Sequence, residues 1–404
     1  MKNCKLVLVG LGGYGNHYVG LLSEDVDKSL YTLAGVVDPF AKTAPGYSKM
    51  VEAGVPIYDT LEAFYAENTA DLAIVSTPIP LHKEHATTAL AHGSHVLCEK
   101  PIAPTLQEAR KMEASAVKYG RTLAIGFQWS FSPAILKLKE DMSKGDFGKP
   151  LKLYSMVSWP RGLSYYRGSW KGCVKTRDGG WILDSVLSNA TAHYLHNMLF
   201  VLGDSYDTSA ELVTAKASLY RANDIESFDT CFLRGETAKG VEVLFAVAHP
   251  TYVNRNPKFR YVFENAEVTI NTEDDTSIIT AKFKDGTVRE YGDPLNEAYR
   301  AAKLTMSIKA ATEGAPVPCV TKTVLPHLRL SNALFDQVAI SNFPKDIVKL
   351  DPARELVYAE GLYETLEEVF KTGKLPSELG LAWAVPETEL SLSGYDAFEG
   401  KKFK

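Results

Sequence analysis

The sequence KLVLVGLGGYG at residues 5–15 decides the fold of the first part of this chain. A short apolar run leads directly into the pattern G-x-G-x-x-G, and residues 16–23 beyond it have helical spacing. Such glycines permit a tight turn and let backbone N–H groups approach a pyrophosphate where the helix begins. We therefore expect this segment to bind a dinucleotide through Gly10, Leu11, Gly12, Gly13, Tyr14 and Gly15.

An acidic residue and a lysine follow two later strands. Asp38 ends the second predicted strand in GVVDP (residues 35–39), where a carboxylate accepts hydrogen bonds from a ribose diol. The same carboxylate repels a 2′-phosphate, so NAD is favoured over NADP. Lys100 follows the apolar run VLC (96–98) in a Glu-Lys-Pro step, at the strand end where open α/β sheets bind ligands. The alternative is a glycine turn without a ligand, with an aspartate that caps the next element.

Strand-like and helix-like segments alternate through residue 128. The strand candidates are residues 5–10, 31–37, 71–76, 94–98 and 121–127, and the helix candidates between them include 80–92 and 105–119. This alternation predicts an α/β fold in which residues 1–128 form a Rossmann domain, a doubly wound parallel sheet.

The pattern changes after residue 128, and residues 129–404 are predicted to form a second, α+β domain with a mainly antiparallel sheet. Helices are expected at 133–143 and 181–202, and a hairpin turn at Asp285-Gly286. The predicted strands are 151–159, 210–219, 228–234, 240–248, 260–270 and 276–283. We expect a helical C-terminal extension from about residue 340.

Composition excludes several classes of protein. The net charge of -5 provides no basic footprint for nucleic acid. The five cysteines are scattered, odd in number and lack C-x-x-C spacing, which indicates reduced thiols in a cytoplasmic protein. No apolar stretch approaches the roughly 18 residues that a membrane span needs.

Three further segments closely resemble one family. They are DLAIVSTP (71–78) with LHKEH (81–85), HVLCEKP (95–101) and GFQ (126–128), and GG-x-x-LD (179–184) precedes His193 more loosely. The chain is similar here to the glucose–fructose oxidoreductase, inositol dehydrogenase and rhizopine-catabolism (Gfo/Idh/MocA) family. The resemblance covers residues 1 to about 335.

The resemblance implies an NAD(P)-dependent oxidoreductase that acts on a sugar or cyclitol and forms a homo-oligomer, a dimer or tetramer. It also implies a Lys-Pro bond that is often cis. The further cofactor contacts that it implies are Thr77, Pro78, His82, Glu99, Lys100 and Gln128.

Oxidation of a secondary alcohol needs a base for the hydroxyl proton, and histidine suits that role. His193 is the candidate base, and Lys100 is expected to bind the same oxygen and stabilise alkoxide charge. The family usually has an aspartate four residues before this histidine, where the present chain has Asn189. Asparagine can orient the ring but cannot offset the charge of an imidazolium. A metal site at His193 and His196 with Asp184 is the weaker alternative, since it lacks a second half-site.

An aromatic and basic segment at residues 159–170 is a candidate substrate loop. Aromatic faces stack on sugar C–H surfaces and arginines bind hydroxyls or carboxylates. The alternative is a packing or interface loop. The expected substrate contacts are Trp159, Arg161, Tyr165 and Trp170, together with Lys100, Asp184 and His193.

Three functions stay open. The first is an NAD-dependent dehydrogenase of a sugar, cyclitol or glycoside hydroxyl. The second is a redox-neutral enzyme that cleaves a glycoside with transiently reduced NAD. The third is an NAD-binding regulator without catalysis, which the presence of both Lys100 and His193 disfavours.

Overall fold

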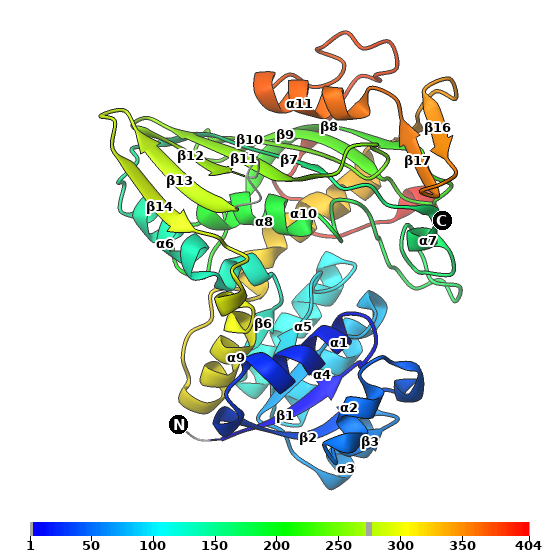
Figure 1. Cartoon of the computed structure of the whole chain (residues 1–404), viewed down its shortest axis with the longest axis vertical. Coiled ribbons are helices and arrows are strands. Elements are labelled where there is room, and N and C mark those ends of the chain that lie inside the picture. Colours follow the sequence, from blue (N-terminus) through cyan, green and yellow to red (C-terminus); the bar gives the residue numbers. More distant parts are fainter. Residues whose placement is uncertain (1–2, 272–276, 404) are drawn as a thin grey trace. The chain divides into compact units, whose positions relative to one another are not determined.

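The computed structural model describes residues 3–271 and 277–403 and contains two compact units (Figure 1). The first unit is Met1–Pro133 with Leu295–Leu325, and the second is Ala134–Pro294 with Pro326–Lys404. The division differs from the single predicted boundary at residue 128, because residues 295–325 return to the first unit. Helix α9 (Ala302–Glu313) in this segment packs against three of that unit's strands, with Leu304 and Ile308 buried.

The first unit is the predicted parallel sheet, with the strand order β3-β2-β1-β4-β5-β6. Its strands are β1 (Cys4–Val9), β2 (Tyr31–Val37), β3 (Ile57–Tyr58), β4 (Leu72–Val75), β5 (His95–Cys98) and β6 (Leu123–Ile125). Its helices besides α9 are α1 (Tyr14–Gly20), α2 (Tyr47–Glu52), α3 (Leu61–Glu67), α4 (His82–Ala91) and α5 (Leu106–Tyr119). The order reverses at β1 and β4, where such sheets open a crevice for ligands.

Local sequence explains where these helices begin and end. Helix α5 is capped at its start by Thr105, whose hydroxyl accepts from the Glu108 N–H and donates to the Glu108 carboxylate. It ends at Gly120, whose φ of 60° places it in the left-handed region. No helix in the described ranges combines the length and apolar character needed to cross a bilayer.

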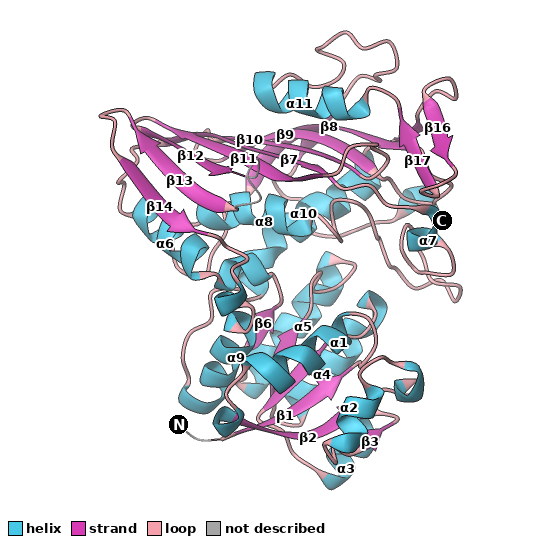
Figure 2. Ribbon diagram, in the orientation of Figure 1, coloured by secondary structure: helices cyan, strands magenta, loops and turns pink. Residues whose placement is uncertain are grey.

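The second unit is built on a ten-stranded, mostly antiparallel sheet (Figure 2). Its central strands are β7 (Pro150–Ser158), β8 (Leu212–Arg221), β9 (Thr230–Thr237), β10 (Glu242–Ala248) and β11 (Arg255–Phe263). One edge carries β12 (Ala266–Asn271), β13 (Ile278–Phe283) and β14 (Val288–Gly292), and the other carries β15 (Ile340–Asn342) and β18 (Thr388–Ser391), which both pair with β8. Within the described strands of this second sheet, only β10–β7 and β15–β8 pair in parallel.

Helices cover both faces of this sheet. In Figure 1, α6 (Pro133–Ser143), α8 (Ala192–Val201) and α10 (Thr321–Gln337) lie on one face, and α11 (Leu362–Thr372) lies on the other. Leu362, Leu366 and Val369 of α11 pack on sheet residues such as Met156 and Leu244 in one buried apolar cluster. The C-terminal segment therefore covers the face of the sheet opposite to α6, α8 and α10.

The predicted helical extension beyond residue 340 is wrong. Besides α11, the segment forms β15, β18 and an antiparallel hairpin of β16 (Val348–Asp351) with β17 (Leu356–Ala359). The physical reason is that β8 leaves an edge whose unpaired backbone groups accept short strands, and prolines break the segment into short pieces.

Two element predictions in the second unit also need correction. The predicted helix 181–202 is helical only from Ala192, because the preceding residues turn at Leu183, whose φ is 52°. The predicted strand 260–270 is two strands, β11 and β12, separated by a turn at residues 264–265. The Asp285-Gly286 hairpin turn is confirmed between β13 and β14. The predicted strand 276–283 is observed from Ile278, and Thr276 lies outside the described residues.

Candidate functional site

The glycine loop follows β1 as predicted, and its shape depends on having no side chains. Gly10 has a φ of 90°, and a Cβ on Gly15 would lie 2.0 Å from the Gly10 carbonyl oxygen. Gly12 and Gly13 differ from Gly15 in this respect, because a Cβ on either would meet nothing within 4 Å. The loop therefore packs tightly on the side of the sheet and leaves an open backbone surface, which fits a pyrophosphate.

Asp38 lies beside this loop at the end of β2. Its Oδ2 accepts from the Leu11 N–H at 2.7 Å and its Oδ1 accepts from the Phe40 N–H at 2.8 Å. Each carboxylate oxygen keeps a second lone pair for a hydroxyl. The Leu11 side chain is fully buried, so this residue faces the loop surface through its backbone.

The ends of β4 and β5 are joined by His82, which is buried. Its Nδ1 lies 2.9 Å from the Pro101 carbonyl oxygen and its Nε2 lies 2.8 Å from the Thr77 carbonyl oxygen. Burial lowers the pKa of this histidine, although both carbonyls favour its protonated form. His82 thus holds the Thr77-Pro78 turn next to the Lys100–Pro101 bond, which is cis as the resemblance implies.

Glu99 forms a buried polar cluster with Tyr18 and Lys303, and the exposed Tyr14 lies at its edge. The Glu99 Oε1 accepts from the Tyr18 hydroxyl at 2.6 Å and from the Lys303 ammonium, and its Oε2 accepts from the Lys100 N–H at 3.3 Å. The Lys303 ammonium also lies 4.7 Å from the centre of the Tyr14 ring. The predicted contact of Glu99 with a cofactor stays a prediction, since the structure places this carboxylate beneath the loop.

Electrostatics hold both members of the Glu99–Lys303 pair in the charged form. Burial alone would raise the pKa of Glu99, but the Lys303 ammonium and the Tyr18 hydroxyl outweigh it and the pKa is lowered. Burial alone would lower the pKa of Lys303, but the Glu99 carboxylate outweighs it and the pKa is raised. The pair ties α9 to the end of β5.

The first unit thus brings the predicted cofactor residues to one edge of its sheet. Lys100 follows β5 and is half-buried. Gln128 follows β6, and its Oε1 accepts from the Tyr14 hydroxyl at 3.1 Å. The glycine loop, Asp38 and Thr77 follow β1, β2 and β4 at the same carboxyl edge.

In the second unit, His193 lies in the first turn of α8. Every other residue of this helix is buried, whereas His193 is half-buried. His196 turns the opposite way, because its ring stacks near Phe200 at 6.0 Å and meets the edge of His327 at 6.4 Å. Burial and His327 lower the pKa of His196 well below the usual histidine value. Among the described residues, no group of three His, Cys, Asp or Glu side chains could hold a metal ion.

Asn189 and Asp184 form hydrogen bonds with two different parts of the second unit. The Asn189 amide donates to the Tyr165 hydroxyl at 3.4 Å, so it connects the start of α8 to the aromatic segment. Asp184 is buried, and its Oδ2 accepts from the Gly172 N–H. Asp184 therefore anchors the loop that follows residue 166.

Three of the predicted substrate residues cluster around one guanidinium. The Arg161 guanidinium carbon lies 5.6 Å from the Trp159 ring centre and 5.3 Å from the Tyr165 ring centre. The Lys171 ammonium covers Tyr165 at 4.1 Å. Trp170 lies half-buried in the loop that follows, and no contact of its ring is part of this cluster.

Burial controls the ionisation of this cluster. It raises the pKa of Tyr165, with a further increase from the Asp184 carboxylate, so the hydroxyl stays neutral. Burial and the Arg161 guanidinium lower the pKa of His249 to about 3, and its Nδ1 lies 2.8 Å from the Trp159 carbonyl oxygen. A neutral His249 supports the end of β7 without adding charge.

Sequence reasoning missed Lys303, Lys171 and His249. For Lys303 a signal exists, because this lysine is adjacent to the apolar stripe of Leu304 and Ile308 on a helix. A lysine at the edge of a buried face requires an internal partner. Nothing in the sequence around Lys171 or His249 distinguishes them from surface or core residues.

The similarity of this chain to known proteins is clearest in the first unit. Residues 4–127 match the model of an oxidoreductase family with an NAD-binding Rossmann fold, which confirms NAD as the predicted cofactor at the level of the family. The chain is 31% identical over 159 residues to the rhizopine catabolism protein MocA of Rhizobium meliloti, covering 39% of this chain and 48% of that protein. It is 24% identical over 240 residues to the inositol 2-dehydrogenase of Pseudomonas savastanoi, covering 59% and 66%.

Solved structures share the fold of both units. The aldose-aldose oxidoreductase of Caulobacter crescentus superimposes with a TM-score of 0.68 at 20% identity, covering 83% of this chain and 97% of that chain. The WlbA dehydrogenase of Bordetella pertussis, solved with NADH and UDP-GlcNAcA, has a TM-score of 0.66 at 19% identity, covering 81% and 94%. Both are covered almost completely, whereas nearly a fifth of the present chain lies outside each superposition.

Proposed function

We propose that this chain belongs to the Gfo/Idh/MocA family of oxidoreductases, whose model its residues 4–127 match, and that it transfers hydride between NAD and a hydroxyl-bearing carbon of a sugar, cyclitol or glycoside. The observation that carries the proposal is the carboxyl edge of the parallel sheet, where the glycine loop, Asp38 and Lys100 lie together. The curated relatives named as dehydrogenases and reductases act on cyclitols and sugars, which supports the substrate class.

NAD, when bound, supplies a nicotinamide carbon that exchanges hydride with the substrate carbon. The open backbone at Gly12 and Gly13 would hold its pyrophosphate, and Asp38 would accept hydrogen bonds from a ribose diol. Gln128 and Tyr14 form one side of the loop through their mutual hydrogen bond.

Proton transfer is assigned to His193, which would take the hydroxyl proton of the substrate at a ring nitrogen. Its half-buried position at the start of α8 supports this role, because the rest of the helix is buried and fixes the backbone from which the ring projects. Lys100 would donate a hydrogen bond to the same oxygen and stabilise negative charge as it develops. Arg161 and Tyr165 would bind other hydroxyls, with the Tyr165 hydroxyl neutral and free to donate or accept.

The decisive experiment measures moles of NADH formed per mole of product, over a panel of free sugars, cyclitols and glycosides. We expect a ratio near one for at least one class, since net oxidation leaves the hydride on the cofactor. Product without NADH would replace this proposal with the redox-neutral glycoside-cleaving enzyme. NAD binding without any product would favour the regulator.

Cofactor preference provides a second test. Asp38→Asn keeps the shape of the side chain and removes its charge, so repulsion of a 2′-phosphate should weaken. We expect the ratio of the NADP to the NAD dissociation constant to fall about tenfold, or ~1.4 kcal/mol, by fluorescence titration. An unchanged ratio in Asp38→Asn would contradict the role of this carboxylate. Asp59→Asn, at the start of the segment before α3, is the matched control.

We also propose a homo-oligomer in the cytoplasm. The five cysteines are free thiols, which suits a reducing compartment. Since α11 and the segment around it cover one face of the second sheet, subunit contacts would have to use other surfaces.

A further inference from the structure

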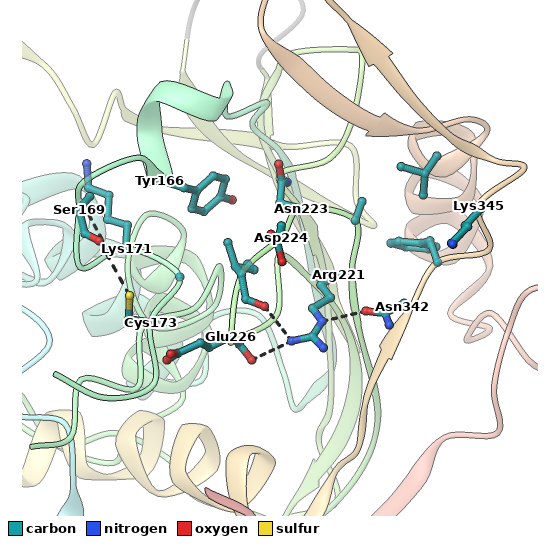
Figure 3. Close-up of a pocket in the computed structure, with 15 residues that line it drawn as sticks. Tyr166, Ser169, Lys171, Cys173, Arg221, Asn223, Asp224, Glu226, Asn342 and Lys345 are labelled. Carbon is teal, nitrogen blue, oxygen red and sulfur yellow. Dashed lines mark hydrogen bonds between the residues drawn. The ribbon is translucent and has the colours of Figure 1, made fainter. Parts of the chain in front are cut away.

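The second unit contains a cavity of about 670 Å³ at the end of β8 (Figure 3). Its walls come from three segments: residues 166–173 after helix α7 (Leu163–Tyr166), the β8–β9 loop at 221–226, and residues 342–348 of the C-terminal segment. The volume is in the range of small-molecule sites. The third wall lies beyond the residues that carry the family resemblance, which end at about residue 335.

Two buried polar groups in the cavity wall have no hydrogen-bond partner. They are the Tyr166 hydroxyl and the Asn223 Oδ1, and Figure 3 shows the hydroxyl directed toward Asn223. Asn223 is 4% exposed and fixed in place, because its Nδ2 donates to the Asp229 carboxylate at 2.9 Å. A buried polar group without a partner destabilises the protein, because it has lost its hydrogen bonds to water. A ligand hydroxyl would satisfy both, since it accepts from Tyr166 and donates to Asn223.

The charged groups of the cavity do not select an ion. The Arg221 guanidinium is already engaged, with Nε donating to the Asn342 side chain at 2.8 Å and NH1 to the Ile225 carbonyl oxygen at 2.7 Å. The other charged side chains are of both signs: Lys171 and Lys345 are cations and Asp224 is an anion, and the Lys171 ammonium already lies over the Tyr165 ring at 4.1 Å. The Glu226 carboxylate accepts from the Val174 N–H at 2.7 Å.

Apolar surface lies beside these polar groups. The Tyr166 ring, Phe343 and Val348 all line the cavity, and Phe343 stacks on Tyr220 with ring centres 5.0 Å apart. Such surfaces suit the C–H faces of a saturated ring. A ring that carries hydroxyls and no charge matches both the apolar walls and the unsatisfied pair.

We propose that this cavity binds a neutral polyhydroxylated ring, one sugar or cyclitol unit, through Tyr166 and Asn223. This site is separate from the residues assigned to hydride and proton transfer, and binding there needs neither NAD nor turnover. It would let the chain hold a second ring of a larger substrate or a separate carbohydrate ligand.

The test is direct binding without NAD, by isothermal titration calorimetry and ligand-observed NMR, with methyl β-glucopyranoside, myo-inositol and glucose 6-phosphate as probes. We expect saturable binding of at least one neutral probe, and weaker binding of the phosphate. Val348→Trp fills the cavity and should abolish the signal. Tyr166→Phe removes only a hydroxyl and should weaken binding about 2- to 10-fold, the value of one neutral hydrogen bond.

Lys349→Trp is the matched control, because the neighbouring residue of β16 points to the other side of the strand. It should bind like the unaltered protein, and melting temperatures of all variants verify folding. No saturable signal with either neutral probe would mean that water alone fills the cavity, and would overturn the proposal. Binding lost in His193→Ala but kept in Val348→Trp would place the ligand elsewhere and overturn it equally. Tighter binding of glucose 6-phosphate would contradict the neutral class.

Discussion

Replacing His193 by alanine is expected to lower kcat about 10³-fold while the dissociation constant of NAD stays within twofold. Loss of a positioned general base typically costs 10²–10⁴ in rate. Cofactor affinity should persist, because the glycine loop and Asp38 belong to the other unit. The measurement is steady-state NADH formation with the substrate that the stoichiometric panel identifies, together with NAD titration of the same variant.

Two further variants make this result specific. His193→Gln keeps a hydrogen-bonding side chain but cannot take up a proton at neutral pH, so it should be almost as slow as His193→Ala. His92→Ala removes an exposed histidine that stacks on Tyr65 in the first unit and should leave kcat unchanged within twofold. A His193→Ala variant that retained a third of the activity would rule out this residue as the base.

Replacing Lys303 by methionine is expected to destabilise the protein by about 3–5 kcal/mol, because it leaves the buried Glu99 carboxylate without its cation. Thermal and urea denaturation would measure the loss. NAD affinity should fall as well, since the pair lies against Tyr14 of the glycine loop. Lys49→Met is the matched control, as Lys49 pairs with Glu24 on the surface of the same unit and should contribute at most ~1 kcal/mol.

The sign of the pH dependence of folding stability follows from the pKa shifts of Glu99 and Lys303. The pKa of Glu99 is lowered on folding, so its contribution is present above its unfolded pKa and is lost as the pH falls through the folded value. The pKa of Lys303 is raised, so its contribution is present below its unfolded pKa and is lost as the pH rises through the folded value. The pair therefore stabilises the protein across the neutral range.

In the Lys303→Met variant, the contribution of Glu99 to the pH dependence of folding stability changes sign. Burial without a cation raises the pKa of the carboxyl, so the folded variant binds a proton that the unfolded chain releases. Its stability should then decline from pH 5 toward pH 8, where the unaltered protein shows no such loss. The double variant Glu99→Gln with Lys303→Met should recover part of the stability and lose this pH dependence. Equal stability of the single and double variants at pH 8 would contradict a charged pair.

Much of the first unit was predictable because its signals are local. The strand at 31–37 was predicted at its observed bounds, since a buried parallel strand is a short apolar run between turns. The glycine loop was predictable because a backbone with φ of 90° at Gly10, and a Cβ clash at Gly15, restrict those positions to glycine. The Thr105 cap of α5, at the start of the helix candidate 105–119, is also a local feature.

The second unit was predicted less well, because its elements depend on distant partners. The segment beyond residue 340 has helical composition in part, but β8 offers it an edge and the sheet offers α11 an apolar face. The helix periodicity at 181–202 likewise failed where Leu183 takes a left-handed conformation. The different surroundings of His193 and His196, one half-buried and the other buried, depend on how the helix packs in its core.

The sequence by itself determined the parallel sheet, the glycine loop, the acid at the end of β2 and the lysine that follows β5. These features arise from residues close together in the chain, whose conformations depend on local sterics and periodicity. Only the tertiary structure brought Lys303 to Glu99 across 204 residues and assembled the cavity from segments around residues 170, 223 and 345. A contact between residues far apart in the chain leaves no local pattern, because it is selected by the free energy of burial in the folded state.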